Sequence, residues 1–148
     1  MTAVTPPRTT GSNDYRKQLH VDAPVSAVVD AVSDLTRIAT WWTPVTRTER
    51  DGDAVRIFMG DGAPLAMQVR VDVEADASTV TWFVQSCGMA QDWAGTAPSF
   101  VVRPAAGGGC DLDFRHVGLE PALECFEQCR AGWDHFVPCI AHHAEVSA

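Results

Sequence analysis

The sequence has no long hydrophobic run and no hydrophobic leader at its N-terminus. A membrane-spanning helix needs about 18 consecutive apolar residues, and no stretch of this chain approaches that length. A secretory signal needs an apolar core, whereas the opening segment MTAVTPPRTTGSND is dominated by small and polar residues. We therefore expect no membrane span and no signal peptide, and we interpret residues 1–13 as a flexible tail.

Basic residues are also few. The chain contains 11 Lys and Arg against 19 Asp and Glu, which gives a formal net charge of -8. The basic residues are scattered rather than clustered, and an acidic surface repels the phosphates of nucleic acids. We therefore expect no nucleic-acid partner.

The five cysteines form no Cys-x-x-Cys pair, and the chain has no His-Glu-x-x-His motif, so two common zinc-binding signatures are missing. An odd number of cysteines without a secretory signal indicates reduced thiols and a cytoplasmic protein. The cysteines are Cys87, Cys110, Cys125, Cys129 and Cys139.

The 148 residues suffice for one domain with a real core, and 46% of them are hydrophobic. We expect this domain over residues 14–144. Tyr15–Val21 alternates between two faces and predicts a strand. Val25–Val32 carries valines at helical spacing, and Asp34 can cap a second short helix from Leu35 to about Trp41.

After Pro44 the apolar pattern has a period of two, which predicts antiparallel strands. The turn residues Asp51–Asp53 indicate a hairpin. Gly95 and Pro98 weaken one later strand and indicate a bulge or an edge there. The strands expected beyond the hairpin are Leu65–Glu74, Ser78–Ser86, Trp93–Arg103 and Cys110–Val117.

Helical spacing returns at Pro121 and continues to about His143. An antiparallel sheet with one solvated face must bury the other, and only this last helix is long enough to cover it. We therefore predict an α+β fold in which a curved sheet of about seven antiparallel strands wraps around a long C-terminal helix. Two short helices follow the first strand, and such an arrangement generally leaves an apolar cavity between sheet and helix.

Local motifs support this order of elements. The segment VDAPVSAVVDAVSDLTRIATWW combines a strand end, Ala-Pro, a helix and Trp-Trp. Further along lie Trp-x-Gly-Thr at Trp93–Thr96, His-x-Gly-Leu at His116–Leu119 and Gly-Trp at Gly132–Trp133. Together, over residues 15–141, they resemble the START-like (SRPBCC) helix-grip superfamily, and in particular the branch named after the C-terminal domain of the Hsp90 ATPase activator.

This resemblance implies a helix-grip fold. The superfamily includes lipid and sterol carriers, polyketide cyclases and hormone receptors, so its fold is a better guide than its functions. Eukaryotic Hsp90 activators have two domains, and this chain has room for one. We therefore do not expect a chaperone partner.

The C-terminal segment carries residue types suited to two kinds of reactive site, a metal site and a nucleophilic pair. On a helix, Cys125 and Cys129 fall within the apolar stripe, whereas His135 and His142 fall on its flank. We therefore expect packed thiols and no metal. A nucleophilic pair of His116 with a helix cysteine is the other alternative, but a buried apolar setting raises the pKa of a thiol and makes it inert.

His116 is the polar residue with the clearest candidate role. It follows Leu112 and Phe114 on the inward strand face, where a neutral imidazole can anchor a ligand carbonyl or hydroxyl. The alternative is a histidine bonded to nearby backbone that shapes the turn into Gly118. Inside the last helix, Gly132 costs stability relative to Ala, and we expect a close approach of helix to sheet there.

We predict that the chain binds a small hydrophobic or amphipathic ligand, such as a lipid, without a cofactor and without catalytic residues. The alternatives are a polyketide cyclase/dehydratase-like enzyme that uses a pocket histidine, and a chaperone-associated interaction module. A homodimer is compatible with the sequence. The expected pocket residues are Trp42, Met59, Met67, Trp82, Trp93, Phe100, Phe114, His116, Cys125, Cys129, Trp133 and Phe136.

Overall fold

The computed structural model describes residues 14–42, 45–59, 65–74, 76, 78–88, 93–124 and 126–147. The expected tail and Cys125 lie outside the described residues. In chain order the elements are β1 (Tyr15–Val21), α1 (Val25–Ser33), the 3₁₀-helix η1 (Leu35–Thr40), β2 (Val45–Asp51), β3 (Ala54–Met59), β4 (Leu65–Val73), β5 (Thr79–Cys87), β6 (Ala97–Pro104), β7 (Cys110–Val117) and α2 (Phe126–Ser147).

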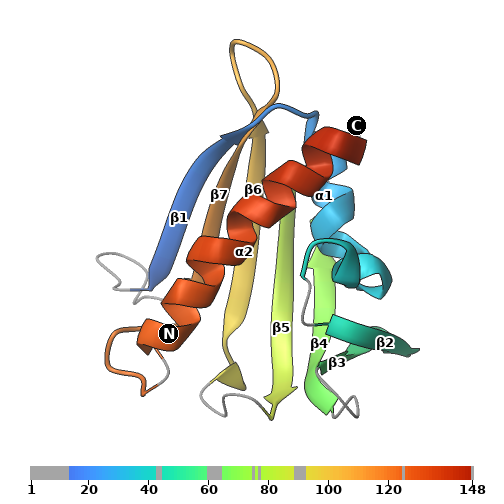
Figure 1. Cartoon of the computed structure of the whole chain (residues 1–148), viewed down its shortest axis with the longest axis vertical. Coiled ribbons are helices and arrows are strands. Elements are labelled where there is room, and N and C mark those ends of the chain that lie inside the picture. The colour runs from blue at the N-terminus through green and yellow to red at the C-terminus, as the bar shows by residue number, and fades with distance from the viewer. Residues whose placement is uncertain are drawn as a thin grey trace.

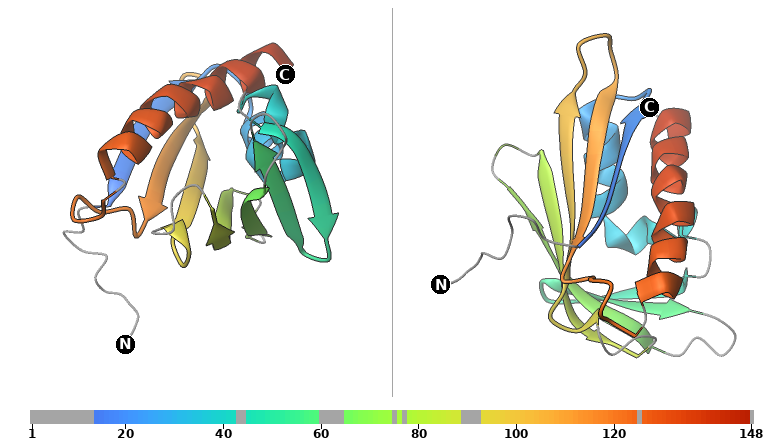
Figure 2. Two further views of the ribbon diagram at one scale, coloured as in Figure 1. Left: turned by 60° about the horizontal axis from the view of Figure 1, so that its bottom comes forward. Right: turned by 90° about the vertical axis from the view of Figure 1, so that its left-hand side faces the viewer.

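The strands form one antiparallel sheet in the order β1-β7-β6-β5-β4-β3-β2. The first strand therefore lies beside the last one, and α1 and η1 lead the chain to the opposite edge at β2. The sheet curves around α2, which crosses its concave side diagonally (Figures 1 and 2). The predicted α+β helix-grip fold is confirmed.

Strand β6 differs from its prediction in two ways. It begins at Ala97 rather than Trp93. Of the two predicted alternatives, a bulge or an edge, the edge is wrong, because the strand lies between β5 and β7. Pro98 faces His116 of β7, whereas pairing with β5 stops at Ser99. Because proline has no N–H to donate, the central strand tolerates it where only one neighbouring strand is paired.

Helix α2 also begins later than predicted. The predicted start was Pro121, but the structure has a turn there and the helix starts at Phe126. The turn is closed by bonds from Leu123 N to Glu120 O (2.9 Å) and from Phe126 N to Leu123 O (3.1 Å). These span three residues rather than four, and apolar spacing alone does not distinguish the two patterns.

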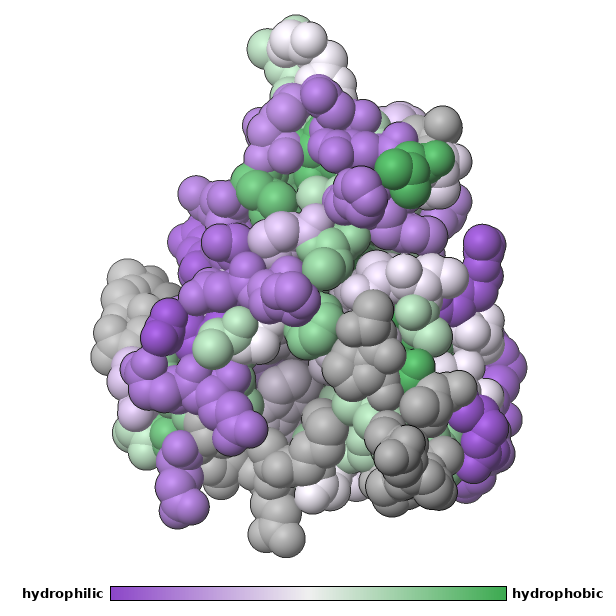
Figure 3. Space-filling model, in the orientation of Figure 1, coloured by the Kyte–Doolittle hydropathy of each residue, from purple (hydrophilic) through white to green (hydrophobic). Residues whose placement is uncertain are grey.

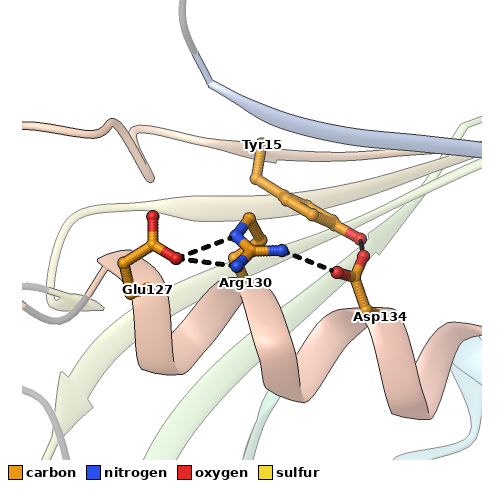
Figure 4. Close-up of polar contacts among 4 residues, drawn as sticks. All are labelled: Tyr15, Glu127, Arg130 and Asp134. Atoms are coloured by element: carbon orange, nitrogen blue, oxygen red, sulfur yellow. Dashed lines mark hydrogen bonds and ion pairs between the residues drawn. The ribbon is translucent and has the colours of Figure 1, made fainter.

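A polar clamp formed by Tyr15, Glu127, Arg130 and Asp134 fastens the N-terminal half of α2 to β1 (Figure 4). The buried Tyr15 hydroxyl donates to the Asp134 carboxylate. Arg130 donates to Asp134 at 3.1 Å and to Glu127 at 2.7 Å. Burial first, and then the bond to Asp134, raise the pKa of Tyr15 above its ordinary value.

No helix within the described part of the chain combines the length and the apolar character needed to cross a bilayer.

Candidate functional site

An aromatic cluster lies between the sheet and α2. Its neighbouring ring centroids are 4.5–6.3 Å apart, the range in which aromatic pairs attract one another. Trp82, Phe100 and Phe114 are completely buried at its base on the sheet. The members of the cluster are Trp41, Trp42, Trp82, Trp93, Phe100, Phe114, Trp133 and Phe136.

Two indoles of this cluster hold α1 in place. Trp41 Nε1 donates to the Ala31 carbonyl at 2.9 Å, and Trp82 Nε1 donates to the Val32 carbonyl at 2.7 Å. Both carbonyls belong to the last turn of α1, where backbone oxygens have no partner within the helix. The tryptophans therefore satisfy buried polar atoms of the helix as well as filling space.

His116 sits beside the cluster with no exposed surface and with both ring nitrogens bonded. Trp133 Nε1 donates to Nδ1 at 2.9 Å, so Nδ1 carries no proton. The neutral ring therefore holds its proton on Nε2, which donates to Thr96 Oγ1 at 2.7 Å. The Thr96 hydroxyl in turn donates to the Trp93 carbonyl at 2.6 Å. The result is one continuous chain of hydrogen bonds from α2 to the turn before β6.

Burial lowers the pKa of His116 to about 3, and the nearby charge of Asp14 opposes this shift only in part. The imidazole is therefore neutral at physiological pH, and both of its hydrogen-bonding positions are occupied. Its partners are an indole and a hydroxyl rather than the backbone that the sequence suggested. This geometry favours a structural role over that of a ligand anchor.

The motifs around Thr96 and Gly118 fit into each other. Gly95 has a φ of +86°, and the Thr96 amide closes the turn by donating to the Trp93 carbonyl at 2.9 Å. Gly118 has a φ of +96°, and a Cβ there would come within 2.9 Å of Thr96 Cγ2. Glycine at 118 therefore gives Thr96 room to reach His116.

The cysteines are dispersed. Cys110 is buried, and its desolvation raises the pKa of its thiol. Cys129 is half-buried on α2, and its sulfur accepts a hydrogen bond from Trp93 Nε1 at 3.0 Å. Among the residues that the structure describes, no group of three or more His, Cys, Asp or Glu side chains is placed to hold a metal ion.

The cluster ends at an apolar rim, which consists of its own member Phe136 together with Met59, Phe126 and Cys129. These side chains pack against the core but are only partly buried. Phe136 contacts Trp42, with ring centroids 6.0 Å apart. On the sheet side, Val45 bonds to Trp42 and pairs with Met59. The rim therefore borders the cluster along both α2 and β3.

Gly132 lies on the flank of α2 that also carries Cys129 and Phe136. The expected close approach of helix to sheet at this residue is wrong, because a Cβ built at Gly132 would meet nothing within 4 Å. Open space therefore adjoins the apolar rim.

Comparisons with known proteins were made for sequence and for structure. No protein-family profile matches the chain, and no curated protein matches it in sequence. The solution structure of the Aha1 dimer from Colwellia psychrerythraea matches with a TM-score of 0.70 and 18% identity, over 90% of this chain and 96% of that one. This chain therefore shares the helix-grip fold.

Other solved structures match at similar levels. The di-domain ARO/CYC protein StfQ from the steffimycin biosynthetic pathway has a TM-score of 0.70 and 15% identity, over 88% of this chain and 44% of StfQ. DynU16, from the dynemicin biosynthetic locus, has a TM-score of 0.63 and 23% identity, over 92% of this chain and 48% of DynU16. The chain thus spans less than half of these two proteins, and the likeness at such identities is one of fold.

Within this helix-grip fold, the aromatic cluster unites seven of the predicted pocket residues, and His116 and Cys129 bond to its tryptophans. Met67 is buried on β4 opposite Ile57 and Cys87, and Met59 lies at the rim. The prediction omitted Trp41 and Thr96. Both stood in motifs already recognised, Trp-Trp and Trp-x-Gly-Thr, which would have identified them.

Proposed function

We propose that the chain binds a small apolar or amphipathic molecule at the apolar rim, above the aromatic cluster. The observation that carries this proposal is the open space at Gly132, which is flanked by half-buried Cys129 and Phe136. An apolar group that entered this space would remove its own surface and that of the rim from water. This burial would stabilise the complex by about 25 cal/mol per Å² of apolar surface.

The binding position we propose is shallower than the pocket expected from the sequence. Trp82, Phe100 and Phe114 are fully buried against one another and against Trp133, so we assign them to the base beneath the ligand. Exposed Gln128 and His135 on the same side of α2 leave the polar end of an amphipathic ligand in contact with water.

The two alternatives receive less support. A cyclase-like enzyme would need a histidine with a free nitrogen, whereas both nitrogens of His116 are bonded within the protein. An interaction module would need a broad exposed apolar patch, whereas hydrophobic atoms are scattered among hydrophilic ones over the coloured part of the face in Figure 3. A homodimer stays a prediction, and the dimeric Colwellia structure supports it.

The proposal is tested with cis-parinaric acid, an amphipathic probe whose fluorescence increases in apolar surroundings. We expect saturable binding to the wild type. Gly132→Phe fills the open space and should weaken binding about tenfold, which corresponds to about 1.4 kcal/mol. Ala131→Phe is the matched control, because it adds the same ring at an exposed position one residue away.

Equal affinity of both variants, or no saturable binding to the wild type, would contradict the rim as the ligand site. Native mass spectrometry of protein purified from its own host then identifies the ligand, because a bound small molecule adds its mass to that of the chain.

A further inference from the structure

A separate groove of about 430 Å³ lies at the other end of α2, where the last turns of that helix pack beside α1. Its walls come from three elements, and its polar lining is Ser26, Asp30, Asp34, Arg37, Thr40, His143 and Ser147. We infer that this groove is a second binding site, for a small zwitterion of the amino-acid class that carries an ammonium and a carboxylate group.

The charged groups of the groove differ in whether they already form hydrogen bonds or ion pairs within the protein. Asp34 caps η1, because one of its oxygens accepts the Thr36 amide at 3.3 Å. Within the described residues, no hydrogen bond or ion pair engages the side chains of Asp30, Arg37 or His143. By contrast, Arg16, Arg56 and Arg115 all have carboxylate partners. The groove therefore presents one anion, one cation and one imidazole that are available to a ligand.

This set of groups selects the ligand by charge. A simple anion would face the carboxylates of Asp30 and Asp34, and a simple amine would leave Arg37 without a partner. A zwitterion gives both side chains a partner of opposite charge, because its ammonium can pair with Asp30 and its carboxylate with Arg37. The planar guanidinium of Arg37 matches the geometry of a carboxylate. The His143 ring adds a further hydrogen-bonding group. The hydroxyls of Thr40 and Ser147 donate to the Arg37 and His143 carbonyls, and their oxygens can still accept from an ammonium.

The groove also connects to the aromatic cluster. Ala31 forms part of its wall, and the carbonyl of the same residue accepts the Trp41 indole. We therefore expect a ligand that contacts this wall to change the fluorescence of Trp41, in addition to releasing or absorbing heat.

The test uses three probes of similar length that differ in their charged groups. L-lysine carries both groups, cadaverine is the same molecule without the carboxylate, and glutarate has carboxylates only. Binding is measured by calorimetry and by tryptophan fluorescence with the wild type, Asp30→Asn and Arg37→Gln. Asp30 and Arg37 are exposed, so both variants should keep the fold. Asp72→Asn and Arg103→Gln make the same chemical changes at exposed positions on the sheet.

We expect L-lysine to bind more tightly than cadaverine and glutarate not to bind. Asp30→Asn should weaken L-lysine and cadaverine alike by about tenfold, whereas Arg37→Gln should weaken L-lysine only. The inference is overturned if L-lysine does not bind at millimolar concentration. It is also overturned if Arg37→Gln affects both amines equally, or if the sheet variants weaken binding as much as the groove variants.

Discussion

Tyr15 is the single tyrosine of the chain, so one spectroscopic signal reports on the polar clamp. Its pKa is raised from 10.0 by burial and by the Asp134 bond, and the stabilisation that accompanies this shift is complete below pH 10 and is lost as the pH rises through the folded-state pKa. In an alkaline titration, we expect tyrosinate absorbance of the native protein to appear well above pH 10 and to coincide with unfolding.

Two controls define the cause of this shift. In denaturant, Tyr15 should titrate near its ordinary pKa of 10.0. Asp134→Asn removes the negative charge beside the phenol and should bring the native titration closer to that value. A native titration at the ordinary pKa would show that the hydroxyl of Tyr15 is not held in the clamp.

His116 makes stability depend on acidity in the opposite direction. Its folded-state pKa of about 3 lies below the ordinary 6.5, so the unfolded chain binds more protons between these values. The contribution of His116 to stability is therefore complete above pH 6.5 and declines as the pH falls towards 3, by at most about 1.4 kcal/mol per pH unit.

The variant His116→Gln isolates this effect. Its amide can accept from Trp133 and donate to Thr96, but it does not titrate. Between about pH 7 and about pH 5, urea unfolding should show the wild type losing about 2 kcal/mol more stability than this variant. Carboxylates titrate in both proteins and cancel in the difference. Parallel losses would mean that the native imidazole is accessible to protons.

At this scale the sequence identified the important residue but not its partners. Alternation along Cys110–Val117 placed His116 on the inner face, because side chains of a strand alternate strictly. Its bonds to Thr96 and Trp133 depend on how the turn before β6 and helix α2 meet β7 in space. Such tertiary contacts have no local pattern in the sequence.

At the scale of elements, a substitution at Gly132 tests whether helix α2 requires glycine at this position. Nothing lies within 4 Å of a Cβ at this position, so Ala fits without displacing a neighbour. Since Ala favours the helix over Gly by about 1 kcal/mol, Gly132→Ala should raise the free energy of unfolding by about that amount.

Chemical denaturation measures this gain, and Gly118→Ala provides the contrast. At Gly118 the positive φ and the contact with Thr96 should make the same substitution destabilising, by about 1–3 kcal/mol. A loss of stability in Gly132→Ala would mean that the helix does approach a neighbour there.

The boundaries of elements were harder to predict than the elements themselves. Periodicity identified β7 well, because burial imposes it along the whole strand, and the Asp34 cap identified η1. The late starts of β6 and α2 result from turns at Trp93–Thr96 and Glu120–Phe126, whose residues also suit the neighbouring strand or helix. Hydrogen bonds decide between such alternatives, and the sequence does not display them.

At the scale of the whole molecule, the fold was predictable because few arrangements bury one face of a seven-stranded sheet with a single long helix. The position of the candidate site was not. The same apolar pattern describes Trp82, which is completely buried, and Phe136, which is half-buried at the rim. Only the three-dimensional packing of the rings separates the base of the site from its edge.

The pairing of β1 with β7 has a consequence for synthesis of the chain. Strand β1 leaves the ribosome before the other six strands, yet its pairing partner β7 is made after all of them. Asp134 follows 119 residues beyond Tyr15. Hairpins from β2 to β7 can form while translation continues, whereas β1 must wait as an unpaired strand. Until β1 docks, the edge of β7 stays open, and that interval is when the nascent chain is most exposed to wrong pairing.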